Sequence, residues 1–207
     1  MPNRDSWLLP LGLLLRRRRP GPARSLRHAP ELATAATIDV TSPAFPHGGT
    51  IGRRHSGTGR GANLSPQLRW GPVPEGTTEL LLVLEDVDVP FAEPGIHLAA
   101  LLPADLTGLA EGELTPDHPR IRWVPVRRGR TGYHGPRPFP GHGDHRYGFH
   151  LFALDSAVPD EVVRTAAAEA ERAAVAGDRR ATALRPLVAQ LDGHVLAHGF
   201  LEGRQRG

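Results

Sequence analysis

Short apolar runs separated by clusters of turn-forming residues recur along most of the chain. This spacing is typical of an all-β sandwich, in which each strand is brief and each turn is rich in Gly, Pro, Asn or Asp. The run at 80–84 has five consecutive apolar residues, which predicts a central strand buried on both faces. The predicted strands are 38–42, 68–70, 80–84, 95–102, 121–126, 147–154 and 194–201.

One region between the last two predicted strands has helical periodicity instead. Asp160 is the expected N-cap, and Gly177 is expected to end the helix. The helical spacing is kept by Val163, Ala166, Ala167, Ala170 and Ala174. We therefore predict a mainly β protein, an antiparallel β-sandwich with a few peripheral helices.

The N-terminal segment is apolar at residues 7–15 and is followed by four consecutive Arg residues, 16–19. A secretory signal carries its positive charge before the apolar run, so we interpret residues 1–36 as an amphipathic arm and linker before a domain at 37–207. We expect Leu11, Leu14 and Leu15 to pack on the domain, with membrane-surface contact through the Arg cluster as the alternative. The arm should be dispensable for folding of the domain. No segment approaches transmembrane length, and we expect a cytoplasmic location.

Composition narrows the chemistry that this chain of 207 residues can perform. All 25 basic residues are Arg and there is no Cys, which excludes thiolate nucleophiles, Cys-ligated zinc and Schiff-base lysines. The pI of 10.4 reflects the lack of Lys and Cys titration more than a basic surface, since the formal net charge is only +3. With 5% aromatic residues there is no basic, aromatic stripe for nucleic acid, so we expect no nucleic-acid partner.

Two carboxylates, Asp86 and Asp88, follow the buried apolar strand and precede Pro90. In an extended chain, residues two apart share a face, so the strand could deliver both acids to one place. The alternative is a turn in which the Asp side chains accept hydrogen bonds from backbone amides.

Histidines mark two further segments. His97 lies in the apolar run that follows, where a hydrogen-bonded core residue is the alternative to a ligand group. A Gly- and Pro-rich loop then leads into His145 and Tyr147, which share a strand face, while Arg146 points to the other face. The spacing from His142 to His145 matches no standard zinc pattern, so we predict no metal.

Several motifs in order resemble the phosphatidylethanolamine-binding protein family, in its bacterial Raf kinase inhibitor-like branch. They are the run Asn63-Leu64-Ser65-Pro66-Gln67-Leu68-Arg69-Trp70, the Asp-x-Asp-x-Pro at 86–90, His97, the loop into His145-Arg146-Tyr147, and Gly193-His194-Val195-Leu196-Ala197. The resemblance extends over roughly residues 37–206. The chain departs from the usual pattern at Val87, Leu98, Leu102 and Phe139, which affects the rim of the site and its ligand preference.

The resemblance implies a β-sandwich with a small pocket that binds anions, including the phosphate of a small molecule or phospholipid head group. It implies no catalysis and no cofactor, and it leaves open a kinase- or protease-inhibitor role, a protein partner and a homodimer. The implied pocket residues are Asp86, Asp88, Pro90, His97, Gly135, Pro136, His145 and Tyr147. The alternatives are a metal-assisted hydrolase that uses Asp86, Asp88, His97 and His145, or a pure protein-interaction module.

Three expectations follow for this pocket. Asp86, Asp88, His97, His145 and Tyr147 should converge on one surface cavity, and the Val89–Pro90 peptide bond should be cis. Anion binding should favour protonated His97 or His145 and weaken as pH rises. Nearby carboxylates should move that decline above the ordinary histidine pKa of about 6.5.

Overall fold

Two β-sheets form the body of the protein in the computed structural model, which describes residues 6–178 and 181–207. The larger sheet has seven strands, ordered β1-β10-β9-β5-β6-β8 with β3 also paired to β10, and the smaller has the order β2-β4-β7. Most pairings are antiparallel, but β1 and β3 run parallel to β10. The strands are β1 Thr37–Ile38, β2 Val40–Thr41, β3 Gly49–Thr50, β4 Leu68–Trp70, β5 Glu79–Asp86, β6 Gly95–Pro103, β7 Gly108–Leu109, β8 Arg122–Trp123, β9 Asp144–Leu154 and β10 Val195–Arg206.

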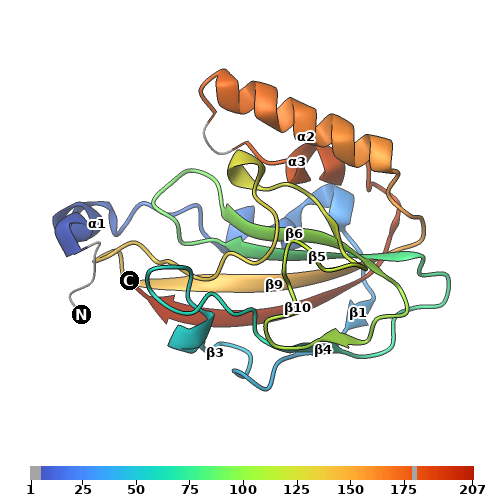
Figure 1. The fold of residues 1–207 in the computed structure, drawn as a ribbon, viewed down its shortest axis with the longest axis horizontal. Coiled ribbons are helices and arrows are strands. Elements are labelled where there is room, and N and C mark those ends of the chain that lie inside the picture. Colours follow the sequence, from blue (N-terminus) through green and yellow to red (C-terminus); the bar gives the residue numbers. More distant parts are fainter. Residues whose placement is uncertain (1–5, 179–180) are drawn as a thin grey trace.

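The helices are few, and α2 and α3 lie together on one face of the larger sheet (Figure 1). The α-helices are α1 Leu9–Leu15, α2 Asp160–Val175 and α3 Leu184–Val188. The short 3₁₀ helices are η1 Ser6–Leu8, η2 Pro22–Arg24, η3 Leu26–His28, η4 Pro30–Leu32, η5 Arg53–His55 and η6 Arg127–Gly129. This arrangement confirms the predicted mainly β fold with peripheral helices.

The side chains of β5 alternate between two hydrophobic layers because successive residues of a strand point to opposite faces. Leu80, Leu82 and Leu84 face the layer shared with the smaller sheet. Leu81 and Val83 face the layer under α2 and α3. With β9 on one side and β6 on the other, β5 is the central, doubly buried strand that its apolar run predicts.

The predicted helix is present, with its start displaced by one residue. Asp160 is the first helical residue and Pro159 occupies the N-cap, without a side-chain cap. Gly177 adopts a φ of 106°, a conformation that favours glycine and allows the chain to leave the helix.

The expected packing of the arm is wrong for two of its three Leu side chains. Leu11 is 44% exposed and Leu14 is 79% exposed, Leu15 is half-buried, and Gly12 is the buried residue of α1. The backbone at Gly12 lies directly against the backbone of Pro140 and His142, so the helix approaches the domain too closely for a side chain at this position.

The linker that follows α1 contacts the core at two points. Ser25 Oγ donates a hydrogen bond of 2.6 Å to the buried carboxylate of Glu85, which also accepts from the Leu26 N–H. Leu32 is 3% exposed and belongs to the hydrophobic layer under α2 and α3. The division at residue 37 stays a prediction, but these contacts lead us to expect that the domain needs the preceding residues.

Two further observations concern the backbone. The described residues contain no cis peptide bond, so the expectation for Val89–Pro90 is wrong. The chain instead turns through Val87 and Asp88, and the Phe91 N–H then donates to the Val89 carbonyl at 2.7 Å. Within the described ranges, no helix has both the length and the hydropathy needed to cross a bilayer.

Candidate functional site

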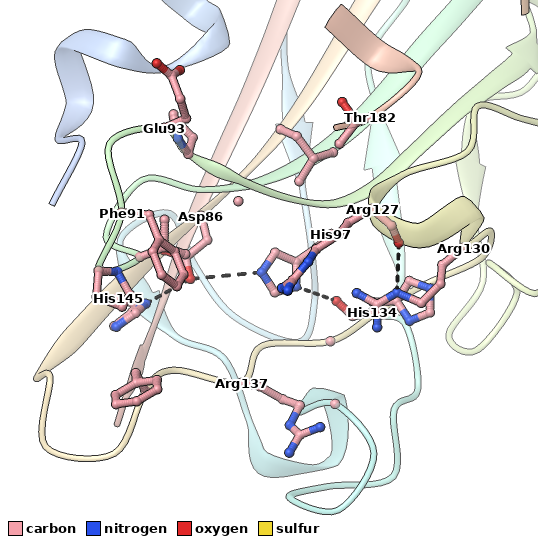
Figure 2. A pocket seen from close by; sticks show the side chains of 18 of the residues that line it. Asp86, Phe91, Glu93, His97, Arg127, Arg130, His134, Arg137, His145 and Thr182 are labelled. Atoms are coloured by element: carbon pink, nitrogen blue, oxygen red, sulfur yellow. Dashed lines mark hydrogen bonds and ion pairs between the residues drawn. The ribbon is translucent and has the colours of Figure 1, made fainter. Parts of the chain in front are cut away.

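Asp86 ends β5 and lies between two histidines from neighbouring strands (Figure 2). One of its oxygens, Oδ2, lies 2.8 Å from His145 Nδ1 on β9 and 4.0 Å from His97 Nε2 on β6. The antiparallel register pairs Asp86 with Tyr147 on one side and with Gly95 on the other, so the three strands deliver their polar residues to the same end of the sheet.

Asp88 does not join this cluster, which corrects the expectation that both acids reach one place. The strand ends at Asp86, so the alternation of faces stops there, and Asp86 Oδ1 accepts a hydrogen bond from the Asp88 N–H at 2.8 Å. The Asp88 carboxylate instead pairs with Arg146 at 2.7 Å and Arg19 at 2.9 Å. Burial opposes its ionisation, but these two guanidinium groups outweigh burial and hold the pKa of Asp88 at about 2.

His145 continues into a hydrogen-bonded chain that reaches the N-terminal arm. Its Nε2 lies 2.9 Å from His142 Nδ1, and His142 Nε2 lies 2.9 Å from the carbonyl oxygen of Leu15. A carbonyl oxygen only accepts, so His142 Nε2 must donate to it. Burial, together with the charges of His145 and Arg19, lowers the pKa of His142, so we assign a neutral ring whose Nδ1 accepts from His145.

The number of protons in this chain follows from its three contacts. Each contact needs one proton, whereas two neutral imidazoles and a carboxylate supply only two. The Asp86–His145 pair therefore holds one additional proton when all three hydrogen bonds are formed. The cavity next to this pair is accordingly more positive than neutral imidazoles and a carboxylate would make it.

His97 is fixed by a hydrogen bond from its Nδ1 to the His134 carbonyl at 2.8 Å. Its Nε2 therefore remains available on the side of Asp86. Burial lowers the pKa of His97 from 6.5, and the attraction of Asp86 does not compensate for it. The expected upward displacement of a histidine pKa by carboxylates is thus wrong for His97, because Asp88 is elsewhere and desolvation is the larger effect.

Tyr147 lies beneath the two histidine rings. The ring centroids of Tyr147 and His97 are 5.4 Å apart with an edge-to-face geometry, and those of Tyr147 and His145 are 6.3 Å apart and stacked. Its hydroxyl is buried, lies close to the Asp86 carboxylate and makes no hydrogen bond of normal geometry with the described residues. Burial, with the charge of Asp86, raises the pKa of Tyr147 well above 10, so the hydroxyl remains a donor.

A cavity of about 380 Å³ opens at this end of the sheet. Five of the predicted residues line it: Asp86, Pro90, His97, Gly135 and His145. The other three lie outside its lining. Asp88 is turned to its Arg partners, Pro136 is buried and accepts from the Gly57 N–H, and Tyr147 supports the histidine rings from behind.

The wall formed by 133–135 is positioned by Asn63, a residue of the first motif. Its side-chain oxygen accepts from the Gly135 N–H at 2.9 Å and its nitrogen donates to the Tyr133 carbonyl at 3.0 Å. Gly135 lies directly against the His55 backbone, which leaves no space for a Cβ. These contacts fix the His134 carbonyl that holds His97.

The basic side of the cavity is not predicted from the sequence. Arg127, Arg130, Arg137 and Arg185 line it together with His134 and Thr182. These residues come from loops and from α3, where no periodic pattern shows which way a side chain points. The concentration of Arg between 120 and 137 was the available signal.

The described residues contain no group of three or more His, Cys, Asp or Glu side chains placed to hold a metal ion. Asp86 Oδ2 is engaged by His145, and Asp88 is engaged by two Arg residues. The donor set therefore does not fit the metal site that a hydrolase mechanism would require.

The fold and the site together define a small β-rich protein with one polar, partly basic cavity at the end of its central strands. The sequence profile of the phosphatidylethanolamine-binding protein family matches residues 41–204, well over half of the chain. The chain therefore belongs to the phosphatidylethanolamine-binding protein family.

Relatives from several organisms are similar to the chain. A UPF0098 protein of Aquifex aeolicus is 34% identical over 128 residues, which cover 59% of this chain and 71% of that protein. A Mycobacterium tuberculosis protein named as a lipoprotein, LppC, is 34% identical over 152 residues, 70% of this chain and 71% of that protein. The chain spans a smaller share, 62%, of the UPF0098 proteins of Mycobacterium bovis and Mycobacterium tuberculosis that it matches.

Solved structures share the fold. A phosphatidylethanolamine-binding protein homologue from Chlamydia trachomatis is 27% identical, with a TM-score of 0.64, and the match covers 84% of this chain and 99% of that one. YbcL from E. coli, described as a member of the mammalian family, is 23% identical with a TM-score of 0.62 over 82% and 98% of the two chains.

Proposed function

We propose that the cavity binds an anion, in particular the phosphate group of a small molecule or lipid head group, without catalysing a reaction. The observation that carries the proposal is a set of buried polar atoms that lack a partner among the described residues. His134 Nε2 and Thr182 Oγ1 are on residues that line the cavity, and the Tyr147 hydroxyl lies just behind it. Buried polar groups are rarely left unpaired, so such a set indicates a ligand or ordered water.

The charge of the lining favours an anion over other polar ligands. Arg130 lines the cavity, and its pKa is lowered by burial and by the neighbouring charges of Arg127, Arg128 and Arg137. Positive charges that crowd one another in this way are relieved by a bound anion. His97 Nε2 adds a hydrogen-bond donor whenever the ring is protonated.

Asp86 has an orienting role in this proposal. A carboxylate repels phosphate, but Asp86 accepts from His145 and faces His97, so it keeps the two rings in place. The proton held by the Asp86–His145 pair neutralises most of that repulsion. Asp86 is thereby converted into part of a neutral support, and the other acidic residue of the lining, Glu93, is paired with Arg24 and Arg185.

Titration calorimetry with inorganic phosphate and with phosphoethanolamine tests the proposal on the full chain. Arg130→Gln and His97→Ala should each weaken binding by about tenfold or more, the value of one charge-assisted hydrogen bond. Arg172→Gln makes the same charge change at an exposed position on α2 that does not line the cavity, and it should bind as the wild type does. The proposal would be overturned if Arg130→Gln and His97→Ala both bound the two probes as tightly as the wild type does.

The two probes also separate the sources of a phosphate group. Tighter binding of phosphoethanolamine than of phosphate favours a head group, and equal binding favours a free phosphate or a different phosphate-bearing molecule. A role as a kinase or protease inhibitor, a protein partner and a homodimer stay predictions from the family.

A further inference from the structure

The first helical segment exposes apolar side chains that the core leaves uncovered. Of the eight large apolar side chains that are exposed in the described part of the chain, five lie between residues 7 and 14. These five are Trp7, Leu9, Leu11, Leu13 and Leu14, and we call them the α1 apolar patch. Such a concentration marks an interaction surface, because isolated exposed apolar residues are normal but clusters are not.

Positive charge adjoins this patch. Arg16, Arg17 and Arg18 directly follow α1 and are exposed. Their side chains have no ion-pair or hydrogen-bond partner among the described residues, and the sequence has no acidic residue between Asp5 and Glu31. The charge of this corner of the molecule is therefore uncompensated.

The patch is held in a fixed position. Arg19 donates to the carbonyls of His142 and Asp144 at 2.6 Å and pairs with Asp88. His142 in turn reaches the Leu15 carbonyl, and Gly12 lies against Pro140. The outward presentation of the Leu side chains is thus part of the docked structure, in which α1 projects at one end of the molecule (Figure 1).

The combination of an apolar patch and uncompensated Arg residues indicates which kind of partner this part of the protein can bind. A second copy of the chain would bring its own Arg16–Arg18 against these residues, and the like charges would repel. A membrane leaflet with anionic lipids accepts both parts, since Leu and Trp enter the interfacial region while Arg contacts phosphate groups. The seven residues of α1 are too few to span the leaflet, so the contact is peripheral.

We propose that the α1 apolar patch and Arg16–Arg18 together dock the protein on an anionic phospholipid surface. This contact is separate from the cavity and does not depend on the function proposed for it. Each basic side chain near an anionic surface strengthens binding by about fivefold, so removal of two should weaken it by about 25-fold.

Flotation of the full chain with lipid vesicles tests the proposal. One set of vesicles contains phosphatidylcholine alone, and the other contains equal amounts of phosphatidylcholine and phosphatidylglycerol. The wild type should float only with the anionic vesicles. The variants Arg17→Ser with Arg18→Ser, and Trp7→Ser with Leu14→Ser, should each lose most of this binding.

Matched variants distinguish the patch from general attraction. Arg172→Ser with Arg69→Ser removes the same charge from exposed positions on α2 and β4, and Val175→Ser removes an exposed apolar side chain from the end of α2. Both should float as the wild type does. His97→Ala should also float normally, because the cavity is not needed for this contact.

Four results would overturn the proposal. They are the absence of flotation with anionic vesicles, flotation that the arm variants retain, equal losses in the arm and matched variants, and a loss in His97→Ala alone. The last result would instead assign lipid capture to the cavity.

Discussion

Arg19 should be a principal link between the N-terminal arm and the domain. Its guanidinium contacts the Asp88 carboxylate at 2.9 Å and donates to the carbonyls of His142 and Asp144 at 2.6 Å each. The side chain of Asp88 is 1% exposed, so water does not screen this pair as it would on the surface. Arg19→Met keeps most of the aliphatic stem but removes these three contacts with the domain, together with the local hydrogen bond from Nε to the Arg16 carbonyl at 3.1 Å.

The magnitude follows from the pKa of Asp88. A displacement from 3.8 to about 2 corresponds to about 2.4 kcal/mol of net stabilisation, which is what Arg146 and Arg19 contribute after burial has opposed them. Arg146 makes more contacts with the carboxylate, so we assign less than half, about 1 kcal/mol, to Arg19. With the two carbonyl contacts added, Arg19→Met should lower the free energy of unfolding by about 2 kcal/mol at pH 7.

The pH dependence has a defined sign. Because folding lowers the pKa of Asp88, its stabilisation is present above about pH 4 and is lost as pH falls toward 2. The difference between wild type and Arg19→Met should therefore shrink over this range. It should not vanish, because the two carbonyl contacts do not titrate.

Urea unfolding followed by tryptophan fluorescence measures this difference at pH 7 and at about pH 3. Arg17→Met is the matched control, since Arg17 is exposed and has no partner among the described residues, and it should change stability by less than about 0.5 kcal/mol. Equal stabilities of wild type and Arg19→Met at pH 7 would refute the reasoning, and so would equal losses in both variants.

Three further predictions concern the arm and the cavity. A chain that starts at Thr37 should be far less stable than the full chain or insoluble, because Asp88 and Glu85 lose their partners from the arm; a melting temperature within a few degrees of the full chain would contradict this. Leu32→Ala should lower the free energy of unfolding, measured with urea, by about 2–5 kcal/mol because Leu32 is buried, whereas Leu14→Ala should change it little because Leu14 is exposed. Phosphate affinity should be greatest at low pH and should start to fall before the pH reaches 6.5, because burial lowers the pKa of free His97 and a bound anion raises it. A constant affinity in calorimetry from acid to neutral pH would contradict this.

The sequence predicts the strands best where packing depends on apolar side chains. The apolar run of β5 is continuous and its side chains pack into both hydrophobic layers, so the position of the strand can be predicted from the run itself. The strands β9 and β10 extend beyond their predicted ends because polar residues such as Arg146 and Arg204 also pair across the sheet. Backbone pairing at these ends leaves no apolar pattern to detect. The strand predicted at 121–126 is shortened to Arg122–Trp123, and Val126 instead pairs with Arg130 across η6.

The site illustrates a second limit. Asp86, His97 and His145 lie on adjacent strands, so family motifs and strand periodicity together indicate that they meet. Asp88 follows the last strand residue, and the turn directs its side chain to Arg146 and Arg19. The Arg residues of the cavity lie on loops and short helical turns, whose positions depend on tertiary contacts such as that between Asn63 and Gly135.

The arm and the cavity are also linked through the proton held by the Asp86–His145 pair. That proton is required only while the Leu15 carbonyl forces His142 to donate from Nε2. If the arm detaches, His142 can change tautomer and donate from Nδ1 to His145, and the extra proton is no longer needed. Loss of this proton would make the cavity more negative.

Loosening of the arm should therefore weaken anion binding even though Arg19 does not line the cavity. We expect Arg19→Met and His142→Phe to bind phosphate several-fold more weakly than the wild type at neutral pH, and Arg17→Met to bind it equally well. Calorimetry measures the affinities together with the protons taken up on binding, which should increase in both weakened variants because the ligand must restore the missing proton. Wild-type affinity and proton uptake in Arg19→Met and His142→Phe would mean that the arm contributes to stability alone.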